Sequence, residues 1–129
     1  MTRPPAPVFA PSRIRVSPDR RTLTLEFTTP DGGVLPPVSY DAEFLRVHSP
    51  SAEVRGHGAA ERKIVSGKRG VRIASVEAIG SYAIRIGFDD GHDSGIYSWA
   101  LFDSLHRDYD IIWNRYLAAL AERKLSRDV

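Results

Sequence analysis

The spacing of hydrophobic residues changes once along the chain, and this change constrains the fold more than any other feature. In the earlier part, apolar and polar residues alternate, as in residues 22–28 and 82–88. After that, apolar residues recur at helical spacing, beginning with Trp99, Phe102 and Leu105. A period of two is typical of a half-buried strand, and a spacing of three or four is typical of a helix packed on one face. Strands followed by the longest helices predict an α+β fold, with a small antiparallel or mixed β-sheet and the C-terminal helices packed against it.

Turn residues divide the chain into short elements. Clusters of Pro, Gly, Asp and Ser separate the apolar runs, and such clusters are typical of chain reversals. The expected strands are residues 14–16, 22–28, 34–35, 71–79, 81–88 and 96–97. The expected helices are residues 39–47, a helix after Ser98 that breaks at 106–108, and a final helix from about 110. Asp41 and Ser98 are suitable N-caps for the first two helices, and Ser51 is suitable for a further turn at 52–55.

Length and proline content indicate how the chain is organised. The 129 residues suit one domain with a core of its own. Residues 1–12 contain four prolines, which favour extended chain, so we interpret them as a flexible arm. Residues 13–125 then form the domain. The glycines within residues 56–70 indicate a flexible connection inside it.

Composition excludes several classes of protein. The chain has no cysteine, so disulfide scaffolds, cysteine-ligated zinc, iron–sulfur clusters and thiol catalysis are excluded. The net charge is only +2, and we expect no nucleic-acid partner. No apolar run approaches the roughly 18 residues of a membrane span, and the first residues lack the apolar stretch of a signal peptide. A cytoplasmic location without membrane association is therefore expected.

Charge is unevenly distributed despite the small total. Residues 53–72 contain six Lys or Arg against two Glu, whereas residues 87–110 contain six Asp against one Arg. These two segments either steer a partner protein or are simply two solvated faces of the domain. The sequence leaves both interpretations open, and it also leaves a homo-oligomer open.

No pattern in the chain predicts nucleophilic catalysis or phosphate binding. Residues 66–70 combine glycines with basic residues, but they lack the glycine spacing that wraps backbone amides around a phosphate. Ser94 lies beside His92 and Asp93, yet neighbours in one tight turn do not form a Ser–His–Asp relay. We therefore expect no enzymatic activity and no cofactor.

Two patterns have the residue types of a metal site. His106 and Asp108 have the spacing of an iron-oxygenase motif, but no histidine follows them to complete the ligand set. Asp89, Asp90 and Asp93 provide carboxylates that suit a hard cation, but the glycines among them equally suit a solvated turn. We interpret the second pattern as a turn.

Two segments resemble a known family. Residues 44–53 read Phe-Leu-Arg-Val-His-Ser-Pro-Ser-Ala-Glu, and residues 84–99 include Asp90-Gly91-His92 followed by an aromatic strand-to-helix junction. They resemble the gamma-butyrobetaine-hydroxylase-like N-terminal domain family over roughly residues 13–106. Members of that family occur alone in bacteria, ahead of the oxygenase barrel in gamma-butyrobetaine and trimethyllysine hydroxylases, or attached to iron–sulfur scaffold ATPases.

The resemblance also implies a zinc site that this chain has not kept. In the hydroxylases the domain binds structural zinc through three cysteines and the histidine of Asp-Gly-His. The cysteine positions here hold Ser49, Ser51 and Val54, so His92 alone is retained. Serine and valine are not zinc ligands, so we expect the metal to be lost and His92 to hydrogen-bond the 49–51 turn. A rescue site built from His48, His57 and His92 stays open.

The resemblance, taken with the lack of a catalytic pattern, predicts a non-enzymatic accessory domain that interacts with another protein. Docking is expected through residues 53–72 or through the acidic turn near His92. The alternative is a small-ligand or metal-binding accessory domain centred on His92, linked to iron–sulfur or oxygenase assembly. Tyr97 and Trp99 stand at a strand-to-helix junction, where aromatic residues are more often core than ligand platform. The candidate functional surface comprises Arg46, His48, Ser49, Ser51, His57, Asp90, His92, Tyr97 and Trp99.

Overall fold

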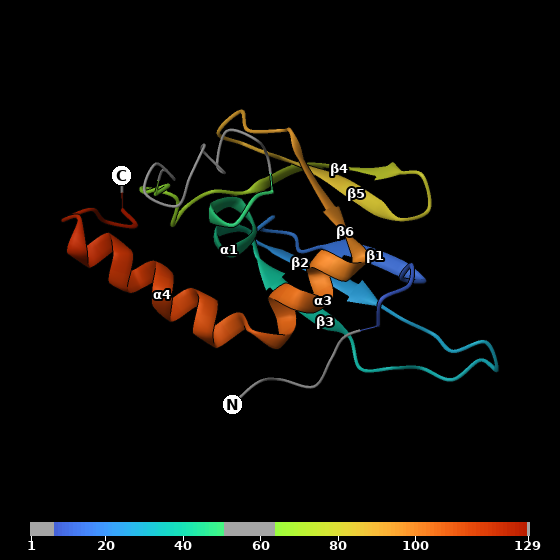
Figure 1. The fold of residues 1–129 in the computed structure, drawn as a ribbon. Coiled ribbons are helices and arrows are strands. Elements are labelled where there is room, and N and C mark those ends of the chain that lie inside the picture. Colours follow the sequence, from blue (N-terminus) through green and yellow to red (C-terminus); the bar gives the residue numbers. More distant parts are fainter. Residues whose placement is uncertain (1–6, 51–63, 129) are drawn as a thin grey trace.

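The strands form two separate antiparallel sheets. The structure is a computed structural model that describes residues 7–50 and 64–128. The first sheet consists of β1 (Arg13–Val16), β2 (Thr22–Glu26) and β3 (Val38–Asp41), in that order. The second consists of β4 (Ile73–Ile79), β5 (Ala83–Phe88) and β6 (Gly95–Ser98), also in chain order. The predicted α+β class is confirmed, although the strands divide between two small sheets (Figure 1).

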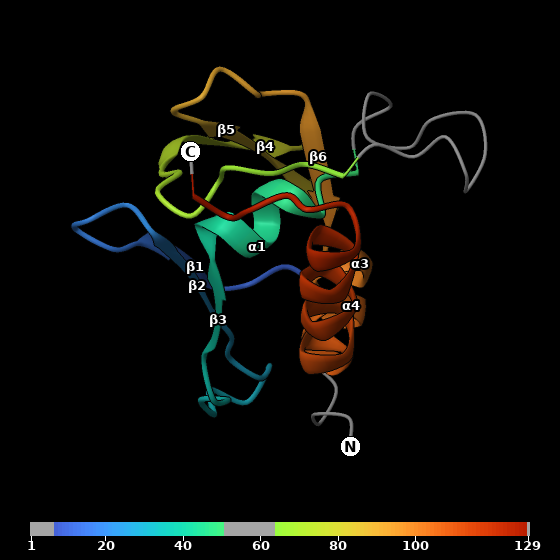
Figure 2. The same ribbon diagram turned by 90° about the vertical axis from the view of Figure 1, so that its left-hand side faces the viewer.

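Helices follow the sheets at the predicted change of period. Helix α3 (Trp99–Arg107) begins after Ser98, whose hydroxyl accepts a hydrogen bond from the Leu101 amide, as the capping prediction requires. Helix α4 (Tyr109–Glu122) follows directly. In Figure 2, α3 and α4 lie on the side opposite the first sheet, and the second sheet lies across the top.

The element predicted over residues 39–47 needs a correction. Its first residues belong to β3, in which Val38 and Tyr40 are buried against the hydrophobic side of β2. The helix, α1 (Ala42–Val47), begins only afterwards. Asp41 occupies its N-cap position, but the Asp41 side chain makes no capping hydrogen bond. Period-two burial in this short segment therefore outweighs its helical pattern.

The predicted strand at 34–35 is reduced to a single bridge between Thr28 and Val34. Pro36 and Pro37 follow immediately, and proline has no N–H to extend a ladder. The turn predicted at 52–55 lies outside the described residues.

Part of the predicted arm contacts the first sheet. The Phe9 ring meets the Phe27 ring edge-on, with centroids 5.8 Å apart. The Ser12 amide and hydroxyl both donate to the Glu26 carbonyl, at 2.7 and 3.1 Å. These contacts attach Phe9 and Ser12 to Phe27 and Glu26 at the end of β2, and the assignment of residues 1–12 as a flexible arm stays a prediction.

Arg20 joins the two sheets. It adopts a left-handed conformation with φ of 62° in the β1–β2 turn. Its carbonyl accepts from the Ile73 amide, and its guanidinium donates to the carbonyls of Ile73 and Ala74 at 2.6 and 2.9 Å. The edge of β4 is thereby tied to the first sheet.

One hydrophobic core extends across both sheets, α1 and α3. Leu23, Phe44, Ile84, Ile86 and Tyr97 are among its fully buried members. Burial of such side chains supplies most of the free energy that favours folding. None of the helices within residues 7–50 and 64–128 has the length and hydrophobicity needed to cross a lipid bilayer.

The tail after α4 returns to α1 and holds α4 against the core. Arg127 makes two hydrogen bonds to the buried Glu43 carboxylate, at 2.7 and 2.8 Å, and its guanidinium lies over the Trp113 ring. The Arg69 amide donates to the Arg127 carbonyl. This set of contacts, which we call the C-terminal clasp, was not anticipated from the sequence.

Candidate functional site

The C-terminal end of α1 meets the turn between β5 and β6. The turn is closed by the Phe88 amide, which donates to the His92 carbonyl at 2.9 Å, and Gly91 occupies it with φ of 92°. Positive φ is accessible to glycine at no steric cost, so the Asp-Gly-His sequence forms a tight reversal here. The reversal places the His92 ring against the residues that follow α1.

His92 and Ser49 are hydrogen-bonded, as the sequence predicts. The Ser49 Oγ lies 2.9 Å from His92 Nε2, and Ser49 is only 3% exposed. Gly95 permits this approach, because a Cβ at that position would lie 2.5 Å from Ser49 Oγ. The Tyr97 hydroxyl donates to the Leu45 carbonyl at 2.5 Å, which adds a second connection between β6 and α1.

Asp90 binds two cations from different segments. Its Oδ2 accepts from Arg46 Nε and from Lys68 Nζ, each at 2.7 Å, and its Oδ1 accepts from the His92 amide at 3.0 Å. Burial alone would raise the pKa of this carboxyl. The hydrogen bonds from Lys68, the His92 amide and Arg46 together outweigh burial and lower the pKa to about 2. Asp90 is therefore a carboxylate at neutral pH.

Two members of the predicted surface, Trp99 and His48, pack within the fold, where Trp99 is buried and His48 is half-buried. His48 Nδ1 lies 2.8 Å from the Phe44 carbonyl, and its ring packs against the rings of Phe44 and Tyr116. Burial lowers the pKa of His48. Trp99 donates from Nε1 to the Ser81 carbonyl at 2.8 Å. His48 Nδ1 and Trp99 Nε1 are thus each engaged by a backbone carbonyl, and neither side chain takes part in the Ser49–His92 hydrogen bond.

Arg46, Ser49, Asp90, His92 and Tyr97 are therefore brought together, and we call them, with Lys68, the polar cluster. Ser51 and His57 lie outside the described residues. Sequence reasoning missed Lys68 and Gly95 as members of this site. Lys68 belongs to the basic segment and faces the acidic turn, so opposite charge was an available signal. No sequence pattern points to Gly95, because its role depends on the close approach of Ser49 Oγ in the folded chain.

Comparison with known proteins agrees with the motifs. A sequence model of the family described as gamma-butyrobetaine hydroxylase-like, N-terminal, matches residues 14–103. The chain belongs to this family.

Solved structures support the assignment to the gamma-butyrobetaine hydroxylase-like N-terminal family. Two proteins determined by NMR in solution are 42% and 34% identical, each with a TM-score of 0.74. The alignments cover 95% and 98% of this chain and 92% and 91% of theirs. A crystal structure of a protein of unknown function from Acidithiobacillus ferrooxidans, of the DUF971 family, is 30% identical with a TM-score of 0.57, covering 74% of this chain and 91% of that one. No curated protein matches the chain.

The zinc site implied for this family does not fit the residues present. The chain has no cysteine, and Ser49 Oγ and His92 Nε2 are at hydrogen-bond distance from each other. Among the residues that the structure describes, no three His, Cys, Asp or Glu side chains are grouped to hold a metal ion. A tetrahedral zinc centre requires four thiolate, imidazole or carboxylate ligands. The polar cluster instead connects α1 to the β5–β6 turn through hydrogen bonds.

Proposed function

We propose that this chain is a non-enzymatic accessory domain that docks on a partner protein. The observation that carries the proposal is that the reactive groups of the polar cluster are used by the fold. Asp90 forms ion pairs with Arg46 and Lys68. His92 is hydrogen-bonded to Ser49, and the Tyr97 hydroxyl donates to the Leu45 carbonyl. These contacts hold α1 and the residue that follows it against the β5–β6 turn and β6.

A second part of the proposal concerns the metal. In our interpretation, the Ser49–His92 hydrogen bond and the Asp90 ion pairs do the work of the family's zinc, which is to hold the turn against the segment after α1. This interpretation is supported by the lack of cysteine in the chain and by the burial of Ser49. The alternative, a ligand- or metal-binding domain centred on His92, has less support because the Nε2 atom is already engaged by Ser49.

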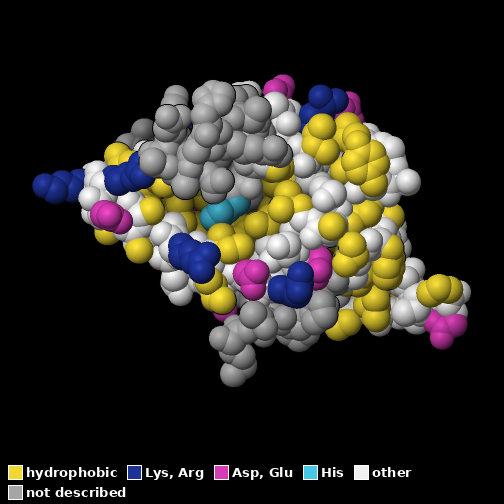
Figure 3. All heavy atoms as spheres, viewed as in Figure 1, with side chains coloured by type: hydrophobic (Ala, Val, Ile, Leu, Met, Phe, Trp, Pro, Cys, Tyr) yellow, Lys and Arg dark blue, Asp and Glu magenta, His cyan; other side chains and the backbone are white. Residues whose placement is uncertain are grey.

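The charged surface agrees with recognition of a protein rather than of a polyanion. On the face shown in Figure 3, Lys and Arg side chains are scattered singly among Asp, Glu and hydrophobic side chains. Two described cations of the basic segment bind carboxylates of the chain itself: Lys68 binds Asp90, and Arg69 binds Asp128. A mixed surface favours a partner with complementary charges of both signs.

The experiment is affinity purification with the tagged full chain, followed by reconstitution of each candidate complex from two purified proteins. Calorimetry then compares the wild type with Arg72→Glu in the basic segment and Asp93→Lys in the acidic turn. Arg13→Glu, on β1, is the matched control. A complex weakened by either of the first two substitutions but not by the control supports docking. If no candidate forms a complex with the purified chain, the docking function is contradicted.

A further inference from the structure

The acidic turn has one aspartate left over after its internal contacts are made. Asp89 accepts the Arg72 amide at 3.0 Å, and Asp90 is held by the polar cluster. Asp93 is exposed, and within residues 7–50 and 64–128 its carboxylate makes no hydrogen bond or ion pair. Asp93 is therefore the carboxylate of this turn that the described part of the chain leaves without an internal partner.

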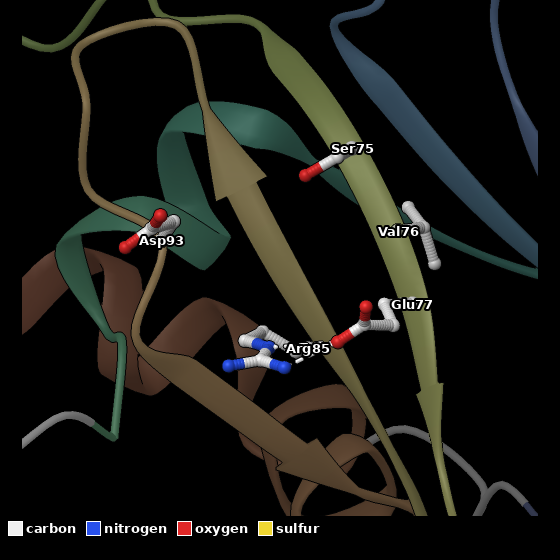
Figure 4. Close-up of a pocket in the computed structure, with 5 residues that line it drawn as sticks. All are labelled: Ser75, Val76, Glu77, Arg85 and Asp93. Atoms are coloured by element: carbon white, nitrogen blue, oxygen red, sulfur yellow. Dashed lines mark hydrogen bonds and ion pairs between the residues drawn. The ribbon is translucent and has the colours of Figure 1, made fainter.

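Asp93 lies at the edge of a hollow on the outer face of the second sheet. The hollow has a volume of about 380 Å³ and is lined by Ser75, Val76, Glu77, Arg85 and Asp93. Figure 4 shows Ser75 and Glu77 coming from β4, Arg85 from β5, and Asp93 from the turn on the other side of β5. Three segments thus contribute polar side chains to one small surface.

Gly87 brings the two sides of this hollow together. It pairs with Ser75 in the ladder, beside an irregularity in the register of β4. A Cβ on Gly87 would lie 2.5 Å from Ser75 Oγ and 3.5 Å from the Cβ of Asp93. Glycine within a strand often marks a place where other groups approach the backbone closely. Here the absence of a side chain lets Ser75 and Asp93 approach the backbone of β5 from its two sides.

The hollow has an excess of negative charge, because the carboxylates of Glu77 and Asp93 face the single guanidinium of Arg85. Arg85 donates from both Nε and Nη2 to the same oxygen, Oε1 of Glu77. Within residues 7–50 and 64–128, the second oxygen of Glu77 and both oxygens of Asp93 accept no hydrogen bond, and both side chains are exposed. Such a surface is complementary to a cation, and a planar guanidinium has five N–H donors that match carboxylates arranged around it.

We propose that this hollow receives an arginine side chain of a partner protein, whose guanidinium bonds Asp93 and Glu77. The inference rests on the proposed docking function and names its surface and the chemistry of its partner. Glu77 is 61% exposed and Arg85 is 45% exposed. Charges as accessible as these set orientation and specificity more than affinity.

The first test uses N-acetyl-arginine-methylamide as the probe and the full ¹⁵N-labelled chain. We expect saturable amide shifts confined to residues 75–77, 85–87 and 93, with millimolar affinity. Asp93→Asn should weaken binding about two- to fivefold. Asp128→Asn, which changes an exposed carboxylate elsewhere, should leave it unaltered. Shifts that do not saturate would overturn the proposal, and so would binding of the probe to Asp93→Asn as tight as to the wild type. Equally tight binding of the corresponding lysine analogue would overturn the assignment to a guanidinium.

The second test separates this inference from the docking function on which it rests. Any partner obtained by reconstitution is titrated with the wild type and with the double variant Glu77→Gln, Asp93→Asn. Loss of affinity in the double variant supports the hollow as the contact. A partner that binds the double variant as tightly as the wild type would overturn the arginine contact and leave the docking function standing.

Discussion

Ser49 and His92 are 43 residues apart in the chain, and their side chains meet at 2.9 Å between the end of α1 and the β5–β6 turn. Both residues occupy positions that hold zinc ligands in the relatives implied by the sequence resemblance. A single neutral hydrogen bond contributes only about 1 kcal/mol, whereas a buried partner left unpaired costs more. The contact therefore matters mainly because its loss would leave a buried polar group without a hydrogen-bond partner.

Replacing His92 should destabilise the domain. His92→Ala leaves the buried Ser49 hydroxyl without this partner, at a cost of about 1–3 kcal/mol and several degrees in melting temperature. A cycle with Ser49→Ala and the double variant should show coupling of about 1 kcal/mol. Thermal melts at pH 7.5 in metal-free buffer measure both quantities.

The control for this prediction is Asp93→Ala, which changes an exposed side chain in the same turn. His106, at the end of α3, is not a suitable control, because its ring lies 6.3 Å from the ring of the buried Tyr40. Equal and negligible shifts for His92→Ala and Asp93→Ala would show that the Ser49–His92 contact does not support the fold.

The purified chain should contain less than one zinc per molecule. Ser49, Ser51 and Val54 stand at the three cysteine positions that the resemblance implies, and none of the three can supply a thiolate. Elemental analysis after dialysis gives the metal content. One tightly held zinc per chain would contradict the prediction and point to His48, His57 and His92, although His48 Nδ1 already lies 2.8 Å from the Phe44 carbonyl.

The sequence predicted what depends on local patterns. Alternation located β2 and β5, the Ser98 hydroxyl caps α3 as expected, and the Asp-Gly-His turn directs His92 toward Ser49. These features depend on residues close in sequence or on motifs shared with relatives. The helix predicted from residue 39 was wrong because burial against β2 decided the conformation of β3, and that pairing is not visible in the local pattern.

Long-range partners could not be predicted in the same way. Lys68 reaches Asp90 and Arg127 reaches Glu43, and each pair joins segments whose distance in space depends on the completed fold. Charge asymmetry indicated that basic and acidic segments exist, but it did not indicate that they bind each other. Surface charge patterns alone do not distinguish an internal ion pair from a docking surface.

Asp90 should make the stability of the domain pH-dependent in acid. Its pKa is lowered from 3.8 to about 2, with the hydrogen bonds from Lys68, the His92 amide and Arg46 outweighing burial. A lowered pKa contributes stability that is present above the unfolded-state pKa and is lost as pH falls through the folded-state value. Asp90→Asn should therefore cost about 1–2 kcal/mol at pH 7 and flatten the stability profile between about pH 4 and pH 2.

Urea unfolding at a series of pH values measures this effect. Asp128→Asn, at an exposed ion pair with Arg69, is the matched control and should change stability by less than about 0.5 kcal/mol. A profile for Asp90→Asn as steep as that of the wild type below pH 4 would be incompatible with the proposed role of this carboxylate.

The C-terminal clasp should depend on one of its two arginines. Arg127→Ala leaves the Glu43 carboxylate, whose side chain is 8% exposed, without its cation, and should cost about 1–3 kcal/mol. Arg69→Ala removes an ion pair in which both side chains are more than half exposed, and should cost less than about 0.5 kcal/mol. Denaturant titrations compare the two variants, and equal losses would show that burial of Glu43 does not set the strength of the clasp.

Two residues with positive φ should respond to glycine in opposite directions. Lys124 has φ of 55° at the end of α4, where the Leu125 amide donates to the Leu120 carbonyl and the Lys124 amide to the Ala121 carbonyl. This is a Schellman ending, in which glycine is favoured at the left-handed position. Lys124→Gly removes the steric cost without breaking a described side-chain contact, and should stabilise the domain by about 0.5–1 kcal/mol.

Arg20 has a similar φ of 62°, but its guanidinium donates to two carbonyls of β4. Arg20→Gly relieves the same steric cost and loses both hydrogen bonds, each formed by a charged donor, so we expect a net loss of about 1 kcal/mol. Melting temperatures of the two variants, measured side by side, give the sign of each change. Stabilisation by both substitutions would show that the Arg20 hydrogen bonds to β4 do not contribute to stability. Destabilisation by both would show that the left-handed conformation of Lys124, after α4, is not strained.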